Sequence, residues 1–141
     1  MHITPLIAST FKTDGGAMFG PVPIVIWSRL MAPDQHHRVP QHANSLLVQL
    51  SDGRRMLIEI GCGHADNFIA KERRIHNLSA GWPLVDELAK VGVEPRQIDF
   101  VILTHLHWDH AGGTGSVAMQ GPQLAPSPPL SPVFMREFHR P

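Results

Sequence analysis

The chain has 141 residues, a length typical of one domain, and its 43% hydrophobic content is enough for a buried core, which excludes general disorder. Twelve basic residues balance twelve acidic ones, so the overall charge gives no reason to expect nucleic-acid or anionic-membrane partners. With one cysteine, no ~20-residue apolar stretch and no signal-peptide pattern at the start, a cytoplasmic protein is expected.

The first third of the chain alternates between apolar and Gly- or Pro-rich segments. Residues 3–11 are predicted to form a short strand, which Pro5 limits to a sheet edge or a strand start. Residues 13–21 are expected to be a Gly-rich loop whose apolar tip, Met18 and Phe19, either covers a cleft or fills the core. Residues 24–27 are apolar but too short to assign to helix or strand, and residues 31–44 are predicted to be a polar loop.

The middle of the chain contains a hairpin pattern. Residues 45–50 and 55–60 are rich in β-forming side chains and flank the turn sequence Ser51-Asp52-Gly53-Arg54. An Asp-Gly pair between two such runs favours a tight antiparallel connection. We therefore expect two neighbouring antiparallel strands here.

Two helices are predicted after the hairpin. The first covers residues 66–77, with Asp66 as its N-cap. The second begins at Pro83, which suits a first helical position, and stops at Gly92. Its apolar positions follow the i, i+4, i+7 spacing of one helix face and are Leu84, Leu88 and Val91.

A short, continuous apolar run, residues 100–103, is expected to be a strand buried on both faces. This order of elements predicts a layered sheet-plus-helix domain, with a site at the carboxyl end of a strand. From Gln120 the sequence is Pro-rich and has no period that could pack. The predicted domain therefore covers residues 1–119, and residues 120–141 are expected to be a linker-like or disordered tail.

The segment directly after this strand carries four metal-ligand side chains within six residues: His105, His107, Asp109 and His110. Imidazole and carboxylate are the ligands that Zn²⁺ takes when its site stays catalytic. Extended backbone would direct His105 and His107 to one side, whereas Asp109 and His110 follow after the chain turns. Ala111-Gly112-Gly113 is small enough to let the backbone fold tightly around ions. The pattern predicts a metal site.

Other candidate residues are better explained by ordinary positions. His36 and His37 are adjacent, so their side chains diverge, and an exposed loop pair is favoured over a ligand role. Cys62, between two glycines, is interpreted as a small buried hydrophobe. Trp108 is expected to pack as a wall of the site. Surface or capped positions account for the isolated histidines, which are His42, His64 and His76.

His-Leu-His-Trp-Asp-His followed by Ala-Gly-Gly resembles the motif of the metallo-β-lactamase-fold hydrolases, and specifically the branch that contains acyl-homoserine lactonases. The likeness extends back to the Gly-rich segment 14–20 and covers about residues 1–115. It implies an α+β fold, a four-layer αββα sandwich with the metal site at one edge, of which only the amino-terminal half is present here.

The same resemblance implies roles for the four ligand residues. His105 and His107 would hold a first Zn²⁺, Asp109 and His110 would hold a second, and other divalent metals are compatible with these ligands. Asp109 would also pass a proton to the leaving group. The implied reaction is hydrolysis of a small-molecule ester, lactone or amide by a metal-bound hydroxide.

The chain also departs from the family. The family uses further histidine and aspartate ligands downstream, whereas after His110 this chain has only His139 and no aspartate. Where the family often has Asp-Thr-Gly, this chain has Glu59-Ile60-Gly61. A truncated, inactive metal-binding remnant or interaction module is therefore an alternative, and a phosphodiesterase is a third, which the neutral charge disfavours. An exposed half-sandwich could also self-associate.

Overall fold

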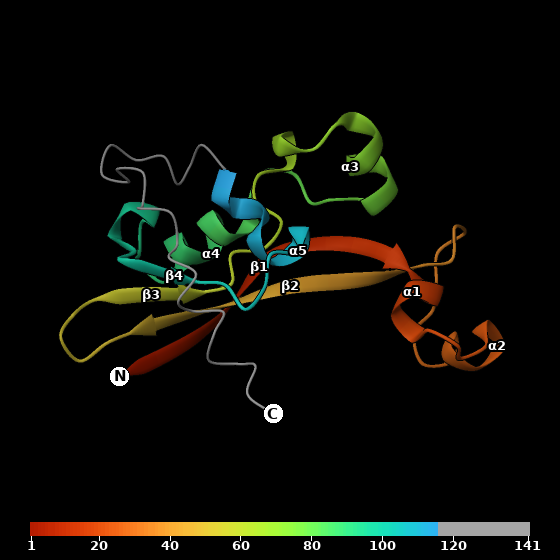
Figure 1. The fold of residues 1–141 in the computed structure, drawn as a ribbon, viewed down its shortest axis with the longest axis horizontal. Helices are drawn as coiled ribbons and strands as arrows, with labels where there is room; N and C mark the ends of the chain where they lie inside the picture. The colour runs from red at the N-terminus through yellow and green to blue at the C-terminus, as the bar shows by residue number, and fades with distance from the viewer. Residues whose placement is uncertain (116–141) are drawn as a thin grey trace, which may run out of the picture.

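The computed structural model describes residues 1–115, which form one mixed four-stranded sheet (Figure 1). In this view α3, α4 and α5 lie above the strands, and α1 and α2 lie at the far end of β1 and β2. The strands follow the chain in the order β1-β2-β3-β4, with β1–β2 and β2–β3 antiparallel and β3–β4 parallel. The strands are β1 (His2–Asp14), β2 (Arg38–Gln49), β3 (Arg55–Ile58) and β4 (Phe100–Ile102). The helices are α1 (Gly15–Phe19), α2 (Ile24–Trp27), α3 (Ala70–His76), α4 (Pro83–Lys90) and α5 (Trp108–Ala111), with 3-10 turns η1 (Ala65–Asn67), η2 (Pro95–Gln97) and η3 (Gly112–Gly115).

The two longest strands, β1 and β2, pair from His2↔Gln49 to Asp14↔Arg38, with a register shift between Ile7 and Ser9. Pro5 lies on the edge strand β1, as expected, because a proline has no backbone N–H to donate within a sheet. The loop prediction for residues 31–44 was wrong over its second half. From Arg38 onward this polar segment is strand, because the far end of β1 supplies a complete hydrogen-bonding partner that overrides the local loop composition.

The Gly-rich segment after β1 is helical, which corrects the loop prediction for residues 13–21. Asp14 begins α1 by accepting a hydrogen bond from the backbone N–H of Ala17 at 3.1 Å. The segment whose state was open, residues 24–27, is α2. Phe19 stacks on the buried Trp27 with ring centroids 5.0 Å apart, and a Cβ on Gly15 would lie 2.3 Å from the same indole.

The predicted hairpin is confirmed: β2 and β3 are antiparallel across residues 51–54, and Gly53 has a φ of +89°. The predicted helix over residues 66–77 is shorter than expected. The turn η1 precedes it, α3 begins only at Ala70, and Asp66 is not its N-cap. Since α3 contains no buried residue, packing of an apolar face does not define its position.

Helix α4 begins at Pro83, as predicted, and covers the face of the sheet that forms the core. Leu84 and Leu88 are both 1% exposed, and burial of each such side chain contributes about 1.5–3 kcal/mol. Val91, predicted to continue this face, is 42% exposed because the helix ends before it. From the sheet, the core contains Leu6, Ala8, Leu47 and Leu57.

The prediction that residues 100–103 are buried on both faces was wrong. Val101 points toward the core, but Phe100 and Ile102 are 42% and 41% exposed, because nothing within residues 1–115 covers the second face of the sheet. The register places Ile102 next to Ile58, and Ile58 next to Leu46, on this open face.

The sheet and its helices form the α+β arrangement expected for half of a sandwich. Among the described helices, none has the length and apolar character needed to cross a membrane. The predicted tail, residues 120–141, lies outside the described residues.

Candidate metal centre

The histidine segment follows the carboxyl end of β4 and lies beside the segment that follows β3. Glu59 donates its backbone N–H to Ile102 at 2.9 Å, and Ile60 donates to His110 at 3.1 Å. Gly61 and Ala111 form an isolated parallel bridge. The two strand ends therefore continue side by side beyond the sheet, which places residues 59–62 directly against residues 102–111.

The predicted ligand residues come together in this region. The imidazole of His105 has its centroid 4.6 Å from that of His107 and 4.0 Å from that of His110. Asp109 Oδ2 lies 3.6 Å from Nε2 of His110. His105 and His107 are exposed, while Asp109 and His110 are half-buried. The three imidazoles thus form one cluster, and Asp109 lies beside it next to His110.

Glu59 is the residue that ties this cluster to the sheet. Its side chain is almost fully buried, and both carboxylate oxygens are occupied: Oε1 accepts from the backbone N–H of Thr104 at 2.7 Å, and Oε2 contacts Nδ1 of His110 at 3.0 Å. Burial alone would raise the pKa of Glu59, but the hydrogen bonds from Thr104 and the nearby His110 lower it below its ordinary value. The carboxylate is therefore charged at neutral pH.

The contact with Glu59 determines which nitrogen of His110 is open. A carboxylate only accepts, so Nδ1 of His110 carries the proton that it donates to Glu59. Nε2 is then left with its lone pair, on the side where Asp109 lies. A carboxylate that orients a histidine in this way is the usual support of a metal-ligating imidazole.

The arrangement fits a divalent cation. One potential ligand atom each from Glu59, His105 and His110 lies within 4.8 Å of the others. Two predicted ligands, His107 and Asp109, lie outside this group, although His107 contacts His105 and Asp109 lies beside His110. Nitrogen with oxygen donors suits Zn²⁺ and its neighbours among the transition metals. In the sequence, Glu59 stood out only because it replaces the aspartate of the family's Asp-Thr-Gly. Its left-handed backbone, with a φ of +63°, is what brings the carboxylate under His110.

Gly112 and Gly113, which follow the ligand residues, are required because other parts of the chain pack very close to their backbone and not because they form a turn. A Cβ on Gly112 would lie 2.3 Å from the carbonyl oxygen of Cys62, and one on Gly113 would lie 2.5 Å from the indole of Trp82. The ligand segment can therefore reach residues 59–62 only because these positions carry no side chain.

A cavity of about 370 Å³ opens beside the cluster. Phe11, Met18 and Trp108 give it apolar walls, and Asp109 and His110 reach it from the metal side. Trp108 packs edge-on against Phe11 with centroids 4.9 Å apart, as expected of a wall residue. The remaining polar lining comes from Thr13, Gln41, His42 and His76.

The other sequence candidates fall elsewhere. His36 and His37 lie in the exposed turn before β2 and belong to no group of potential metal ligands found within residues 1–115. Cys62 is buried, and burial raises the pKa of its thiol to about 11, which agrees with a small hydrophobe and not a reactive thiolate. His76 was expected at the surface, but its ring lines the cavity.

Comparison with known proteins identifies the family. A profile of the Metallo-beta-lactamase superfamily matches residues 38–124. A protein from Bacillus sp described as N-acyl homoserine lactonase is 48% identical over 33 residues, which are 23% of this chain and 13% of that protein.

Solved structures show the same fold. A probable metal-dependent hydrolase from Staphylococcus aureus is 29% identical with a TM-score of 0.70, covering 79% of this chain and 40% of that chain. AidC, described as a dizinc quorum-quenching lactonase, is 22% identical with a TM-score of 0.54, covering 79% and 35%. The chain thus spans less than half the length of these structures. With the superfamily profile matching well over half of its residues, the chain belongs to the metallo-beta-lactamase superfamily.

Proposed function

We propose that this chain provides the metal-binding half of a hydrolase that cleaves a small-molecule ester, lactone or amide. The observation that carries the proposal is a cluster of three imidazoles, with Asp109 beside it, next to a cavity that Asp109 and His110 line. The imidazoles are those of His105, His107 and His110. His105 and His107 would hold one Zn²⁺, and Asp109 and His110 a second. When bound, such cations activate water and polarise a carbonyl group.

The chain's own residues contribute orientation and proton transfer. Glu59 fixes the tautomer of His110 and keeps Nε2 directed at the cluster. Asp109 is half-buried and reaches both His110 and the cavity, so its carboxylate is placed to hold or pass a proton at the leaving-group oxygen. Phe11 and Trp108 exclude water from one side of the cavity.

The lining of the cavity favours a carbonyl substrate over a phosphodiester. Lysine and arginine usually neutralise a phosphate backbone, and among the described residues that line the cavity there is neither. The lactonases among the similar proteins point to the same class of substrate.

One observation favours a second candidate, a remnant that binds metal without turnover. Within residues 1–115 the group of potential metal ligands holds only three residues, Glu59, His105 and His110, which is a small set for two ions. Hydrolysis distinguishes the two candidates.

The test is zinc-dependent hydrolysis of dihydrocoumarin, an aromatic lactone, by the 141-residue chain. The hydrolase proposal predicts turnover that a chelator abolishes and added zinc restores, and that Asp109→Asn reduces by at least about 100-fold. Zinc binding with no turnover above the Asp109→Asn background would favour the remnant instead.

We also propose that the open face of the sheet pairs with a second copy of the chain. Ile3, Leu46, Phe100 and Ile102 all lie on this face and are between 37% and 49% exposed. Apolar sheet faces pack against one another at about 10 Å, and a chain with zero net charge offers little repulsion to such pairing.

A further inference from the structure

His76, the last residue of α3, is the one cavity-lining side chain that this helix contributes. Its ring lies in the wall shared by the 370 Å³ cavity and a smaller neighbouring hollow lined by Phe68, Glu72 and Trp108. The imidazole centroid is 4.7 Å from that of Trp108, with the two planes inclined at 43°. His76 therefore shares the lining of the cavity with Asp109 and His110, although it comes from a different element.

The hydrogen bonding of His76 is incomplete. Within residues 1–115, its Nδ1 is the one buried side-chain nitrogen or oxygen without a hydrogen-bond partner. A buried polar atom left unpaired costs free energy, and a phenylalanine or leucine would fill the same wall without that cost. Side-chain packing alone therefore does not explain why this position carries a histidine.

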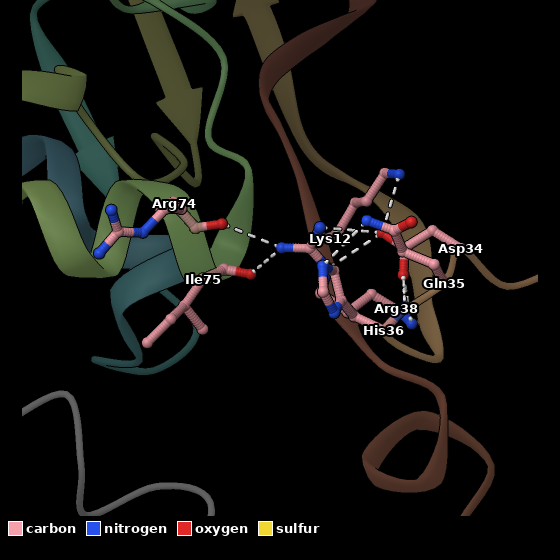
Figure 2. A network of polar contacts seen from close by, with 7 residues as sticks. All are labelled: Lys12, Asp34, Gln35, His36, Arg38, Arg74 and Ile75. Carbon is pink, nitrogen blue, oxygen red and sulfur yellow. Dashed lines mark hydrogen bonds and ion pairs between the residues drawn. The ribbon is translucent and has the colours of Figure 1, made fainter.

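The position of His76 is fixed by polar contacts around it. Figure 2 shows the guanidinium of Arg38 donating from Nη1 to the backbone carbonyls of Arg74, at 2.9 Å, and Ile75. Arg38 is itself held by Asp34, at 3.0 Å from Nε and 2.9 Å from Nη2. These carbonyls belong to the last turn of α3, immediately before His76, where a helix leaves carbonyls unpaired.

The chain that follows His76 is also held in place. Asn77 ends the helix in the left-handed conformation, with a φ of +45°. Ser79 then donates its backbone N–H to the carbonyl of Thr10 at 2.9 Å and accepts from the N–H of Thr10 at 3.3 Å. A helix with no buried residue is thus attached to the sheet on both sides of its only cavity-facing imidazole.

Nδ1 is buried, so Nε2 is the ring nitrogen of His76 that can reach the cavity. We propose that His76 is a substrate-contacting residue, which donates a hydrogen bond from Nε2 to an oxygen of the ester or lactone in the cavity. The substrate's apolar part would lie against Phe11, Met18 and Trp108. This inference rests on the proposed function, since it names a contact within the same site. Arg38 is then a positioning residue, because it acts on substrate only through α3.

The test is binding of dihydrocoumarin to the full 141-residue chain with a chelator present, which suppresses metal-dependent turnover. Binding is followed through the ¹⁵N shifts of the imidazoles. His76→Phe keeps an aromatic ring against Trp108 but removes both nitrogens. It should weaken binding about three- to tenfold, the loss expected for one hydrogen bond, while the melting temperature stays the same or rises.

Two further variants make the result decisive. His76→Gln retains a donor and should bind within about twofold of the unchanged chain, while His36→Phe, in the exposed turn, should match it in both affinity and melting temperature. Equal affinity of His76→Phe and the unchanged chain, or no saturable binding by the unchanged chain, would overturn the proposal. Zinc-dependent hydrolysis is measured separately, so its absence would count against the proposed function and not against this contact.

Discussion

Glu59 occupies an unusual position for its residue type. It is buried, ionised and in left-handed backbone, a combination that costs free energy unless the surroundings compensate. Here the compensation comes from Thr104 and His110, one hydrogen bond to each carboxylate oxygen. Such strain is typical of positions where geometry matters for function, and in this chain it serves to orient one imidazole.

Glu59→Gln should therefore weaken zinc binding by about 10- to 100-fold, because an amide oxygen is a poorer partner for the Nδ1–H of His110 than a carboxylate. Competition with a chromophoric chelator measures the affinity. Asp52→Asn, which alters an exposed carboxylate paired with Arg54, is the matched control and should leave it unchanged. Equal affinities of the two variants would exclude the orienting role of Glu59.

The Asp34–Arg38 contact is a property of whole elements, because it joins the turn before β2 to the end of α3 (Figure 2). Desolvation alone would raise the pKa of Asp34, but hydrogen bonds from Arg38, His36 and Lys12 outweigh it and hold the pKa well below 3.8. A pKa lowered by folding means stability that is present above the unfolded value and is lost as pH falls below it toward the folded value.

Asp34→Asn should accordingly flatten the pH dependence of the unfolding free energy below pH 3.8 and increase amide exchange in the last turn of α3 at neutral pH. Urea unfolding at a series of pH values and hydrogen exchange check the two effects. An unchanged acid slope together with unchanged exchange of residues 73–76 would show that Asp34 does not hold this helix.

The elements that could be predicted from sequence are those whose local residue pattern is enough to specify a helix or a hairpin. The hairpin around Asp52-Gly53 and the helix from Pro83 with Leu84 and Leu88 are of this kind. The Arg38 end of β2 could not be predicted, because pairing with distant residues of β1 overrides its polar composition. The clustering of the histidines could be predicted from their spacing. The position of Glu59 next to His110 could not, because it depends on the left-handed backbone of Glu59. The position of His76 could not either, because tertiary contacts hold its helix in place.

At the scale of the whole molecule, residues 1–115 cover only one of the two faces of the sheet. α4 and the core residues of the strands protect the first face, while the second shows contiguous apolar side chains across all four strands. An apolar patch of this kind favours association.

The 141-residue chain should therefore self-associate at micromolar concentration, and Leu46→Lys with Ile102→Lys should shift it toward monomer, because the two sites lie on the same face on either side of Ile58. Sedimentation velocity measures the distribution. Leu30→Lys, an exposed apolar position outside the sheet, is the control. A chain that is monomeric throughout, or a double variant that associates as strongly as the original, would contradict pairing through this face.

We expect the histidine cluster to bind divalent metal, and the zinc stoichiometry of the chain is the measurement that decides this. Zinc is measured by mass spectrometry after loading and gel filtration of three proteins: the unchanged chain, His105→Ala with His107→Ala, and the control His36→Ala with His37→Ala. We expect the control to retain as much zinc as the unchanged chain, and the cluster variant to fall to the background level. Equal zinc in all three proteins would contradict the claim.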